Sequence, residues 1–357
     1  MMETKVYKID GDKPLESQLA EPGKILTRNG LVAFPTETVY GLGANGLSIK
    51  AVQNIFVVKG RPADNPLILH IAARADLGPL VTRIPPLADK LMEAFWPGPL
   101  TLVFSKSSLI PQEVTGGLET VAVRMPDHPV ALALIKAAGV PLAAPSANLS
   151  GKPSPTLAEH VYHDLQGKIE VIVDGGSTRE GIESTVLDIT GQVPIILRPG
   201  SVTREMLEEV VGQVEVDPAL ARENPIPGVP KSPGMKYTHY APAAQVILVN
   251  GDSAAKVARK ILELVQQGQQ DQLKVAVMVS EETVDQEIGL LTEPSQAFIL
   301  GSRQEPAVIS RQIYGVLREC DQLDIQLIIA EAYPRMGVGM ALMNRLDKAA
   351  AYHIIQV

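Results

Sequence analysis

Short apolar runs alternate with amphipathic stretches along the first long section of the chain. Runs in which alternate residues are apolar predict strands, and apolar residues three and four apart predict helices. Strands interleaved with helices indicate an α/β domain built on one main twisted sheet. Several strands follow one another without a helix, so part of that sheet should be antiparallel. The predicted strands are 30–34, 67–72, 100–104, 120–124, 140–144, 169–173, 184–189 and 195–198, and the predicted helices are 49–58, 87–95, 129–138, 157–165 and 203–211.

The pattern stops between Asp217 and Pro242, where six prolines fall at positions 218, 225, 227, 230, 233 and 242. No helix or sheet interior tolerates that density of proline, so this segment is predicted to be a linker. A linker of this length suggests disorder or a functional covering loop. The stretch Ser232 to Pro242 is rich in aromatic residues, so we expect it to be ordered against a surface.

The alternation resumes after the linker. Predicted strands at 245–249, 275–279, 297–300 and 325–330 alternate with helices at 254–266, 306–319 and 340–351. This order indicates a smaller, Rossmann-like open α/β domain with a parallel core. The sequence thus predicts a catalytic domain over 1–216, a proline-rich linker or active-site cover over 217–243, and a C-terminal α/β domain over 244–357.

Composition narrows the class of protein. A formal net charge of −8 argues against a general nucleic-acid binder, although a local basic cleft remains compatible with it. The single cysteine, Cys320, excludes an intrachain disulfide and a cysteine-based zinc site, and suits a reducing compartment. No apolar run reaches the ~18 residues of a membrane span, and the N-terminus is polar. We therefore expect a cytoplasmic protein without a membrane partner.

Two apparent nucleotide-binding motifs fail on context. Residues Gly41 to Gly46 match G-x-G-x-x-G, but a polar segment separates these glycines from the preceding predicted strand. Residues Ser150 to Pro153 resemble the end of a P-loop, yet the required earlier glycine is missing and Pro153 replaces Ser or Thr.

Basic and neutral polar residues recur where predicted elements end. Lys59 and Arg61 follow a helix with one glycine between them, so both could reach one anion, or they could simply be solvated residues after a helix end. Ser146 and Asn148 follow a strand, where open α/β sheets bind ligands, or they could cap a turn. Alone, each pair leaves both interpretations open.

Other polar residues strengthen the prediction of an anion site. Thr120 and Arg124 share one face of a strand, and Arg198 ends another. Thr36 and Thr38 lie in a polar turn, where hydroxyls hold a ligand or cap the turn, and a lone histidine such as His70 is more often structural. Neither a Ser-His-Asp arrangement nor metal-ligand spacing stands out. The residues predict a cationic α/β pocket for a phosphorylated ligand and do not name the reaction.

At these motifs the sequence resembles the YrdC-like family, in the long two-domain form of threonylcarbamoyl-AMP synthase. The K-x-R pair at 59 and 61 and the S-x-N pair at 146 and 148 match the family signature in the same order. The blocks at 35–42, 59–62, 65–67 and 144–148 resemble family blocks, and 232–242 and 344–346 resemble the long form. The likeness covers nearly the whole chain. It implies a YrdC-like twisted mixed sheet with flanking helices, followed by the smaller domain.

The resemblance implies an ATP-dependent nucleotidyltransferase that joins L-threonine, bicarbonate or CO2, and ATP into threonylcarbamoyl-AMP and pyrophosphate. This is the first step of a tRNA adenosine modification, completed by a separate tRNA threonylcarbamoyl transferase, so any tRNA binding here would be indirect. Carried over by position, the signature residues Lys59, Arg61, Ser146 and Asn148 form the catalytic set. The ATP-binding set is Arg61, Asn65, Thr120, Ser146, Ser154, Arg198 and Tyr237, and the threonine-binding set is Thr36, Thr38, His70, Arg124 and Ser184.

The residue types suit this chemistry. Carbamate and ATP are both anionic, so Lys59, Arg61 and Arg198, with Mg2+ accompanying ATP, would offset their repulsion. The Arg124 guanidinium can hold a carboxylate with two parallel hydrogen bonds. The carbamate and the product decompose in water, so we expect the linker around Tyr237 and Tyr240 to cover the site. Which of Thr36 and Thr38 contacts threonine stays open, and no dedicated metal site is expected.

Two other functions remain as alternatives. A translation factor that binds RNA without catalysis would use the same cations for phosphates, against which the acidic net charge counts. A carbamoyl-adenylate-forming enzyme that uses carbamoyl phosphate would resemble hydrogenase-maturation proteins, but this chain lacks the cysteines of their zinc-finger regions.

Overall fold

The computed structural model describes residues 2–221, 229–233, 236, 240–286 and 296–357. The chain divides into two compact units, one formed by 1–150 with 154–237 and the other by 151–153 with 238–357. The change of unit at 237/238 falls inside the segment predicted to be a linker. The limits of that linker and its covering role stay predictions.

The first unit is built on a large mixed sheet. Within the described residues it has 11 strands in the order β1-β8-β2-β3-β7-β4-β6-β5-β9-β10-β11. Parallel pairs such as β4·β6 and β5·β9 adjoin antiparallel pairs such as β5·β6 and β9·β10, which confirms the predicted mixed sheet. The strands are β1 Lys5–Lys8, β2 Val32–Phe34, β3 Gly41–Asn45, β4 Ile68–His70, β5 Leu100–Ser105, β6 Thr120–Arg124, β7 Leu142–Ala143, β8 Val171–Asp174, β9 Thr185–Asp188, β10 Ile195–Arg198 and β11 Glu215–Val216.

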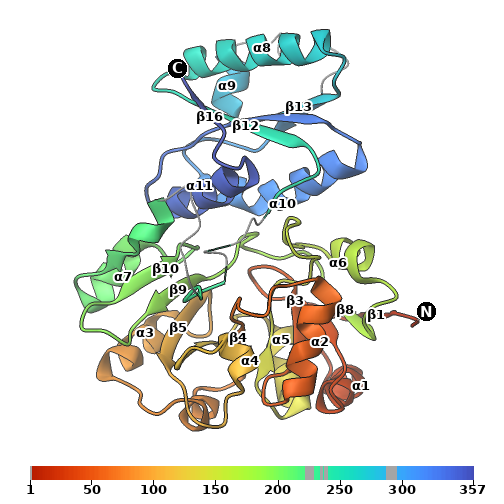
Figure 1. Ribbon diagram of the computed structural model, residues 1–357, viewed down its shortest axis with the longest axis vertical. Helices are drawn as coiled ribbons and strands as arrows, with labels where there is room; N and C mark the ends of the chain where they lie inside the picture. The colour runs from red at the N-terminus through yellow and green to blue at the C-terminus, as the bar shows by residue number, and fades with distance from the viewer. Residues whose placement is uncertain (1, 222–228, 234–235, 237–239, 287–295) are drawn as a thin grey trace. The chain divides into compact units, whose positions relative to one another are not determined.

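Helices flank this sheet (Figure 1). Helix α1 packs against α5, and α3 packs against α7. Local sequence sets the limits of α2. Ser48 accepts a hydrogen bond from the Ala51 N–H at the start of the helix, and Gly60 ends it in a left-handed conformation at φ 62°. The helices are α1 Glu16–Thr27, α2 Ile49–Lys59, α3 Pro86–Phe95, α4 Gln112–Thr115, α5 Pro129–Ala138, α6 Ala158–Leu165 and α7 Arg204–Val211, with short 3-10 helices at Arg74–Leu80 and Pro218–Ala221.

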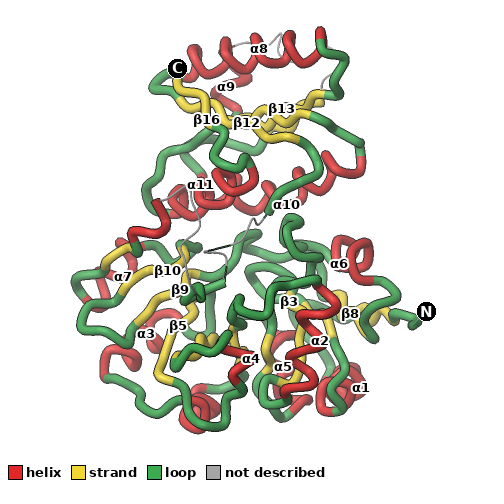
Figure 2. The backbone as a smooth tube through the Cα atoms, viewed as in Figure 1, coloured by secondary structure: helices red, strands yellow, loops and turns green. Residues whose placement is uncertain are grey.

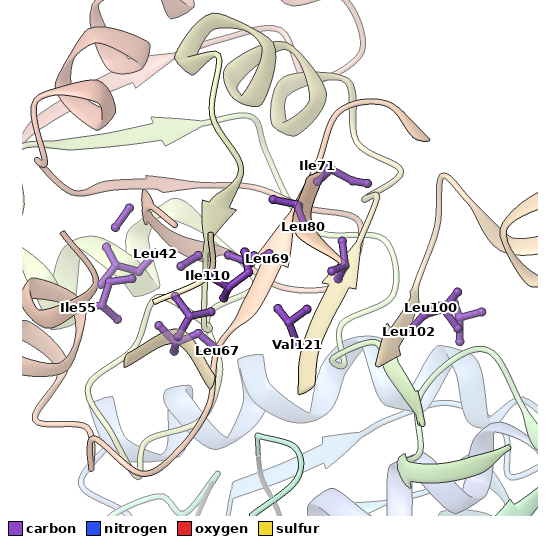
Figure 3. Close-up of a cluster of buried hydrophobic side chains, with 14 of the residues drawn as sticks. Leu42, Ile55, Leu67, Leu69, Ile71, Leu80, Leu100, Leu102, Ile110 and Val121 are labelled. Carbon is purple, nitrogen blue, oxygen red and sulfur yellow. The ribbon is translucent and has the colours of Figure 1, made fainter. Parts of the chain in front are cut away.

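The strands β4, β5, β6 and β9 have two different faces. On one face, residues such as Leu69, Leu102 and Val121 belong to the main hydrophobic core (Figure 3). Because side chains alternate along a strand, the residues between them point the other way. There they form a small apolar cluster of Ile68, Val103, Ala122, Val186 and Leu197. This second face, flanked by polar residues, is where the candidate site lies.

Three elements at the N-terminal side were not predicted. β1 and α1 lie in a stretch of mixed charge, and α1 even contains Pro22. β3 consists of Gly41–Asn45, whose glycines are a poor signal for a strand. Its pairing with β2 and β7 compensates for that weak propensity. Because these glycines lie in a strand and do not open a helix, the rejection of a dinucleotide-binding loop is supported.

The second unit is an open parallel sheet, as predicted. Within the described residues it has five strands in the order β14-β13-β15-β12-β16, and every neighbouring pair is parallel. Helices α8 and α9 lie on one face, and α10 and α11 on the other (Figures 1 and 2). The elements are β12 Gln245–Asn250, α8 Ala254–Gln270, β13 Val275–Val279, α9 Glu281–Gln286, β14 Gln296–Ile299, α10 Pro306–Gln322, β15 Leu327–Glu331, α11 Val338–Ala349 and β16 Ile354–Gln356. None of the helices that the structure describes is long and apolar enough to cross a membrane.

Candidate active site

Strand register brings several of the predicted site residues to one end of the second sheet face. His70 and Arg124 end the parallel strands β4 and β6 and lie opposite each other. Thr101, near the start of β5, pairs with Arg124 on one side and with Val186 of β9 on the other. A register shift between Ile196 and Arg198 places Arg198 opposite Val186. Such a bulge changes the face to which a side chain points, and here it brings the guanidinium to the site.

The turn between β2 and β3 contributes three buried polar side chains, Thr36, Glu37 and Thr38. The Thr36 hydroxyl donates to the Val39 carbonyl oxygen at 2.6 Å and lies 2.8 Å from the Thr38 hydroxyl. Backbone N–H groups of Arg179 and Glu180 donate to the Glu37 carbonyl oxygen at 3.0 and 2.7 Å. Thr36 therefore bonds within the turn, whereas the Thr38 hydroxyl also bonds across to Arg124.

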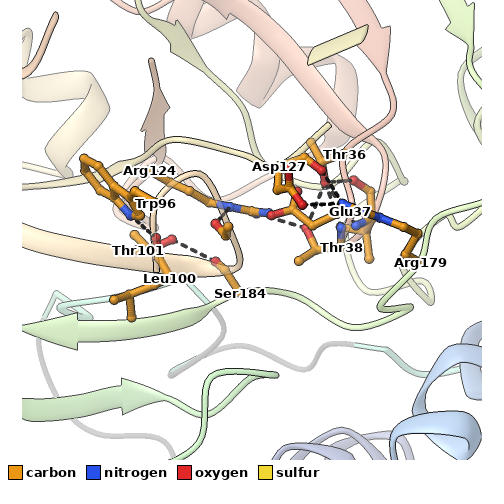
Figure 4. A network of polar contacts seen from close by, with 12 residues as sticks. Thr36, Glu37, Thr38, Trp96, Leu100, Thr101, Arg124, Asp127, Arg179 and Ser184 are labelled. Carbon is orange, nitrogen blue, oxygen red and sulfur yellow. Dashed lines mark hydrogen bonds and ion pairs between the residues drawn. The ribbon is translucent and has the colours of Figure 1, made fainter. Parts of the chain in front are cut away.

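The Arg124 guanidinium connects this turn to the sheet (Figure 4). Its Nε donates to the Gly98 carbonyl oxygen at 3.1 Å, and its Nη1 donates to the Thr38 hydroxyl at 2.9 Å. Its Nη2 lies 2.6 Å from Glu37 Oε1, with both side chains almost fully buried. Charges interact strongly in such a shielded place, so these two side chains are strongly coupled.

Ser184, which directly precedes β9, contacts polar side chains of two strands, β5 and β10. Its hydroxyl lies 2.8 Å from the Thr101 hydroxyl (Figure 4). The same hydroxyl accepts from Arg198 Nη2 at 3.1 Å. Arg198 Nε also donates to the Ser184 carbonyl oxygen at 3.0 Å. Of these residues, Ser184 and Arg198 were predicted from the sequence, whereas Thr101 was not.

His70 is held neutral. Burial and the neighbouring positive charge of Arg124 lower its pKa to about 3. Its Nδ1 lies 3.3 Å from the Ile68 carbonyl oxygen, and its ring packs edge-on against Phe34. His70 thus offers hydrogen bonds and an apolar ring surface to a ligand, and no charge.

The two signature pairs meet at the other end of the face. Lys59, at the end of α2, is buried, and its Nζ donates to the Ser146 carbonyl oxygen at 2.5 Å and to the Asn148 carbonyl oxygen. The Ser146 hydroxyl donates to Asn148 Oδ1 at 2.5 Å. An isolated bridge between Gly41 and Ser146 fixes this loop to β3. Lys59 therefore organises the 146–148 loop.

Arg61, Asn65 and Thr120 gather at this same end. Arg61 donates from Nε to the Asn65 carbonyl oxygen at 3.2 Å and from Nη2 to the Pro66 carbonyl oxygen at 2.9 Å. Pro66 precedes β4 and Thr120 begins the parallel strand β6, so they lie at matching ends. Asn65 is buried, and neither polar atom of its side-chain amide has a hydrogen-bond partner in the described part of the chain. Such an amide is suited to a ligand.

The remaining predicted residues fall in three places. Ser154 donates to Glu183 Oε1 at 2.5 Å, and Glu183 directly precedes Ser184. Tyr237 lies outside the described residues. Tyr240 belongs to the second unit, where its ring packs against Tyr314 at 5.3 Å and lies under Arg345 at 5.8 Å.

The structure adds Glu37, Thr101 and Glu183 to the predicted residues. A signal for Glu37 was present in the sequence, since it is the only charged residue between Asn29 and Lys50. A single carboxylate in an apolar stretch needs a cation when it is buried. The contacts of Thr101 and Glu183 depend on strand pairing and could not be read from spacing.

The described residues contain no group of three His, Cys, Asp or Glu side chains that could hold a metal ion. A surface pocket of about 400 Å³ is lined by mostly apolar residues including Ile71, Leu80 and Ile135. Its lining includes none of the predicted site residues. The polar cluster is therefore the better candidate for the active site.

Known proteins resemble this chain along nearly its whole length. A family model described as "Telomere recombination" matches residues 24–200, and one described as "Threonylcarbamoyl-AMP synthase, C-terminal domain" matches 202–351. The threonylcarbamoyl-AMP synthase of Pyrococcus abyssi is 50% identical over 327 residues, 92% of each chain. That of Bacillus subtilis is 47% identical over 359 residues, 99% of this chain and 100% of the other. A solved structure of P. abyssi Sua5 complexed with L-threonine superposes with a TM-score of 0.92 at 47% identity, covering 99% of this chain and 100% of that one.

Proposed function

Because the chain belongs to the threonylcarbamoyl-AMP synthase family, we propose that it makes threonylcarbamoyl-AMP from L-threonine, bicarbonate or CO2, and ATP, with release of pyrophosphate. The observation that carries this proposal is a single sheet face with two polar ends. One end holds the buried Arg124–Glu37 pair, whose charges suit an amino acid, and the other end holds the signature pairs. Thr120 and Arg124 mark the two ends, and a rise over four positions along the strand places them about 13 Å apart. Two substrates can therefore lie on the same face.

Threonine would bind at the Arg124 end. The guanidinium is suited to the carboxylate, and the Thr38 and Ser184 hydroxyls lie within its cluster. Thr38 is the better candidate for direct contact, because the Thr36 hydroxyl already donates to the Val39 carbonyl oxygen. The neutral His70 would border the threonine side chain without adding a charge.

ATP would span the face from the signature pairs toward Arg198. The Asn65 amide is available to a polar ligand atom, and Arg61 adjoins it. Ser146, Thr120 and Ser154 would supply neutral hydrogen bonds, and Tyr237 stays part of the proposal. Magnesium would arrive with ATP and be held mainly by the phosphates, as Mg2+ often is. When bound, it would neutralise charge on the phosphates.

The reaction would be an adenylyl transfer. The amine of threonine takes up CO2 to give a carbamate, and a carbamate oxygen attacks the α-phosphorus as pyrophosphate leaves. Cations fixed in advance stabilise the charge that develops on the phosphates. Lys59 would act mainly by holding the 146–148 loop, because its ammonium is bonded to two loop carbonyls.

The linker would shield the reaction from water. Its Lys236 Nζ lies 2.7 Å from an oxygen of Asp64, the neighbour of Asn65, and Ser232 is fully buried. These contacts attach the linker to the end of the face proposed for ATP. They support the proposal of a cover within 217–243, in which Tyr240 belongs to the second unit.

The product would pass to a separate tRNA threonylcarbamoyl transferase, because a mixed anhydride decomposes in water. We also propose that the protein works in the cytoplasm, with which its single, buried cysteine is compatible.

The proposed reaction is tested by incubation of the protein with ATP, Mg2+, L-threonine and isotopically labelled bicarbonate, followed by mass spectrometry of nucleotides. A labelled threonylcarbamoyl-AMP is expected. Plain AMP, or an adenylate without label, would rule out the proposed reaction.

A further inference from the structure

We propose that Glu37 binds the α-ammonium group of L-threonine and accepts the proton that the amine must lose before it reacts with CO2. The proposal rests on the proposed function, since it names how that site recognises and activates its amino acid. It assigns a substrate-binding and proton-accepting role to a residue outside the predicted catalytic, ATP-binding and threonine-binding sets.

Glu37 is placed where a fixed carboxylate can meet a ligand. Its side chain is buried, and its backbone carbonyl is held by two N–H groups of the 179–180 segment. Figure 4 shows it beside Thr38 and the end of Arg124. Two neighbouring groups to which the proposed function assigns threonine binding, the Thr38 hydroxyl and the Arg124 guanidinium, are bonded to each other at 2.9 Å.

The Glu37–Arg124 pair is close but incompletely bonded. Arg124 Nη2 and Glu37 Oε1 are 2.6 Å apart, yet the two are not aligned as a hydrogen bond. Within the described residues, Arg124 Nη2 and both Glu37 carboxylate oxygens have no hydrogen-bond partner. Buried charged atoms without hydrogen bonds are costly, and each such group calls for an explanation.

An amino-acid zwitterion matches these three atoms. Its carboxylate can accept from Arg124 Nη2, while its ammonium, on the adjacent carbon, can donate to the Glu37 oxygens. Both charges of the pair would then be satisfied, and the net charge of the cluster would not change. A carboxylate ligand without an amine would satisfy Arg124 alone and leave Glu37 unbonded. The pair therefore selects α-amino acids over hydroxy acids.

The proton balance gives Glu37 a second role. Threonine enters as the ammonium ion, which has no lone pair for the carbon of CO2. Transfer of one proton from nitrogen to Glu37 frees that pair, the N–C bond forms, and a second proton leaves the nitrogen. Bicarbonate yields CO2 by loss of hydroxide, which combines with one of the two protons to form water. One proton is released to solvent, so threonine and bicarbonate give carbamate, water and H+.

A purely structural Glu37 would behave differently. It would hold Arg124 in place, and its loss would weaken binding of any carboxylate at every pH. A proton acceptor is needed less as rising pH deprotonates the threonine amine without help. The pH dependence of the defect therefore separates the two roles.

The experiment compares wild type with Glu37→Gln, Glu37→Asp and the control Glu93→Gln, which changes an exposed residue on α3. Pyrophosphate release is measured between about pH 6.5 and pH 9 with threonine varied, since a general base contributes about 10²- to 10⁴-fold. At neutral pH, Glu37→Gln should lower kcat/KM for threonine by at least about 100-fold, with the defect shrinking as pH rises. Glu37→Asp should recover part of the rate, and Glu93→Gln should match wild type.

Binding supplies an independent measurement by calorimetry on the full-length protein. Wild type should bind threonine at least about tenfold more tightly than 2,3-dihydroxybutyrate, the analogue with hydroxyl in place of the amine. Glu37→Gln should remove that preference. A pH-independent defect, or equal binding of the two ligands by wild type, would overturn the proposal. If Glu37→Gln does not fold, the wild-type preference decides. A wild type without threonine-dependent activity would instead defeat the proposed function.

Discussion

His70 lies directly opposite Arg124 across the parallel pair β4 and β6. The permanent charge of Arg124 and complete burial together disfavour a charged imidazole, and the pKa of His70 falls to about 3. A threonine side chain placed here would meet a neutral ring on one side and a cation on the other. The same relationship makes the free energy of unfolding depend on pH.

The first prediction concerns that dependence. Between pH 6.5 and about 3, unfolded His70 binds a proton whereas folded His70 does not. The free energy of unfolding should therefore fall as pH falls through this window, by at most about 1.4 kcal/mol per pH unit from this residue. Denaturant unfolding of wild type and His70→Gln over this range should show a shallower slope in the variant. Equal slopes would mean that His70 is not held neutral.

The second prediction concerns Asn65. Its buried amide has no partner among the residues described, so Asn65→Ala should change the free energy of unfolding by less than about 1 kcal/mol. The KM for ATP should rise about tenfold, as expected when one hydrogen bond to a ligand is lost. Asn54→Ala, on α2, is the control for kinetics. A clear loss of stability with unchanged KM would assign Asn65 a structural role.

The third prediction concerns Lys59. Its removal leaves the Ser146 and Asn148 carbonyls without their ammonium donor, and each unpaired buried group costs about 1–3 kcal/mol. Lys59→Ala should lower both stability and turnover, and Lys59→Arg should not restore turnover, because a planar guanidinium cannot replace the compact ammonium. Lys90→Ala, an exposed site on α3, should leave both unchanged. Full turnover in Lys59→Arg would contradict a loop-organising role.

The fourth prediction tests how the linker is attached. Asp64 and Lys236 are partly exposed, so their pair should contribute at most about 1 kcal/mol to stability. Asp64→Lys and Lys236→Asp should each raise the KM for ATP by loosening the linker, and the double variant should restore it. The double-mutant cycle is measured at low and high salt. Additive effects of the two changes would show that the contact has no part in binding.

The fifth prediction concerns the second unit. Glu331 is fully buried at the end of β15, where it accepts from Ser280 and pairs with Arg303 at 2.7 Å. Glu331→Ala leaves the guanidinium without its partner and should cost about 3–5 kcal/mol in unfolding. Glu319→Ala, at an exposed position on α10, should cost little. Thermal unfolding measures both, and an unchanged melting temperature in Glu331→Ala would contradict the assignment.

The local sequence pattern predicted those strands in which apolar and polar residues alternate regularly. β6 at 120–124 and β10 at 195–198 have the predicted limits, because one face of each is buried in the core. β1, α1 and the glycine-rich β3 were missed, since their stability comes from pairing and packing with distant segments. Intrinsic propensity is weak beside such tertiary contacts.

The sequence supplied candidate residues for the site but not their arrangement. Lys59 and Ser146 lie 87 positions apart, and strand pairing such as that of β7 with β3 brings the two motifs together. The bulge that redirects Arg198 and the pairing of Glu37 with Arg124 also depend on tertiary structure. The resemblance to the YrdC-like family suggested which residues bind which substrate. The arrangement of these residues at two ends of one sheet face became visible only from the strand register.

The most direct measurement of the central claim is pyrophosphate release from ATP by the purified protein with Mg2+, with and without L-threonine and bicarbonate. Serine and allothreonine serve as substrate controls, and Arg61→Ala serves to place the site. Release should require both threonine and bicarbonate and be lost in the variant. Release that ignores threonine, or that responds to carbamoyl phosphate, would contradict the claim that this sheet face joins threonine to ATP.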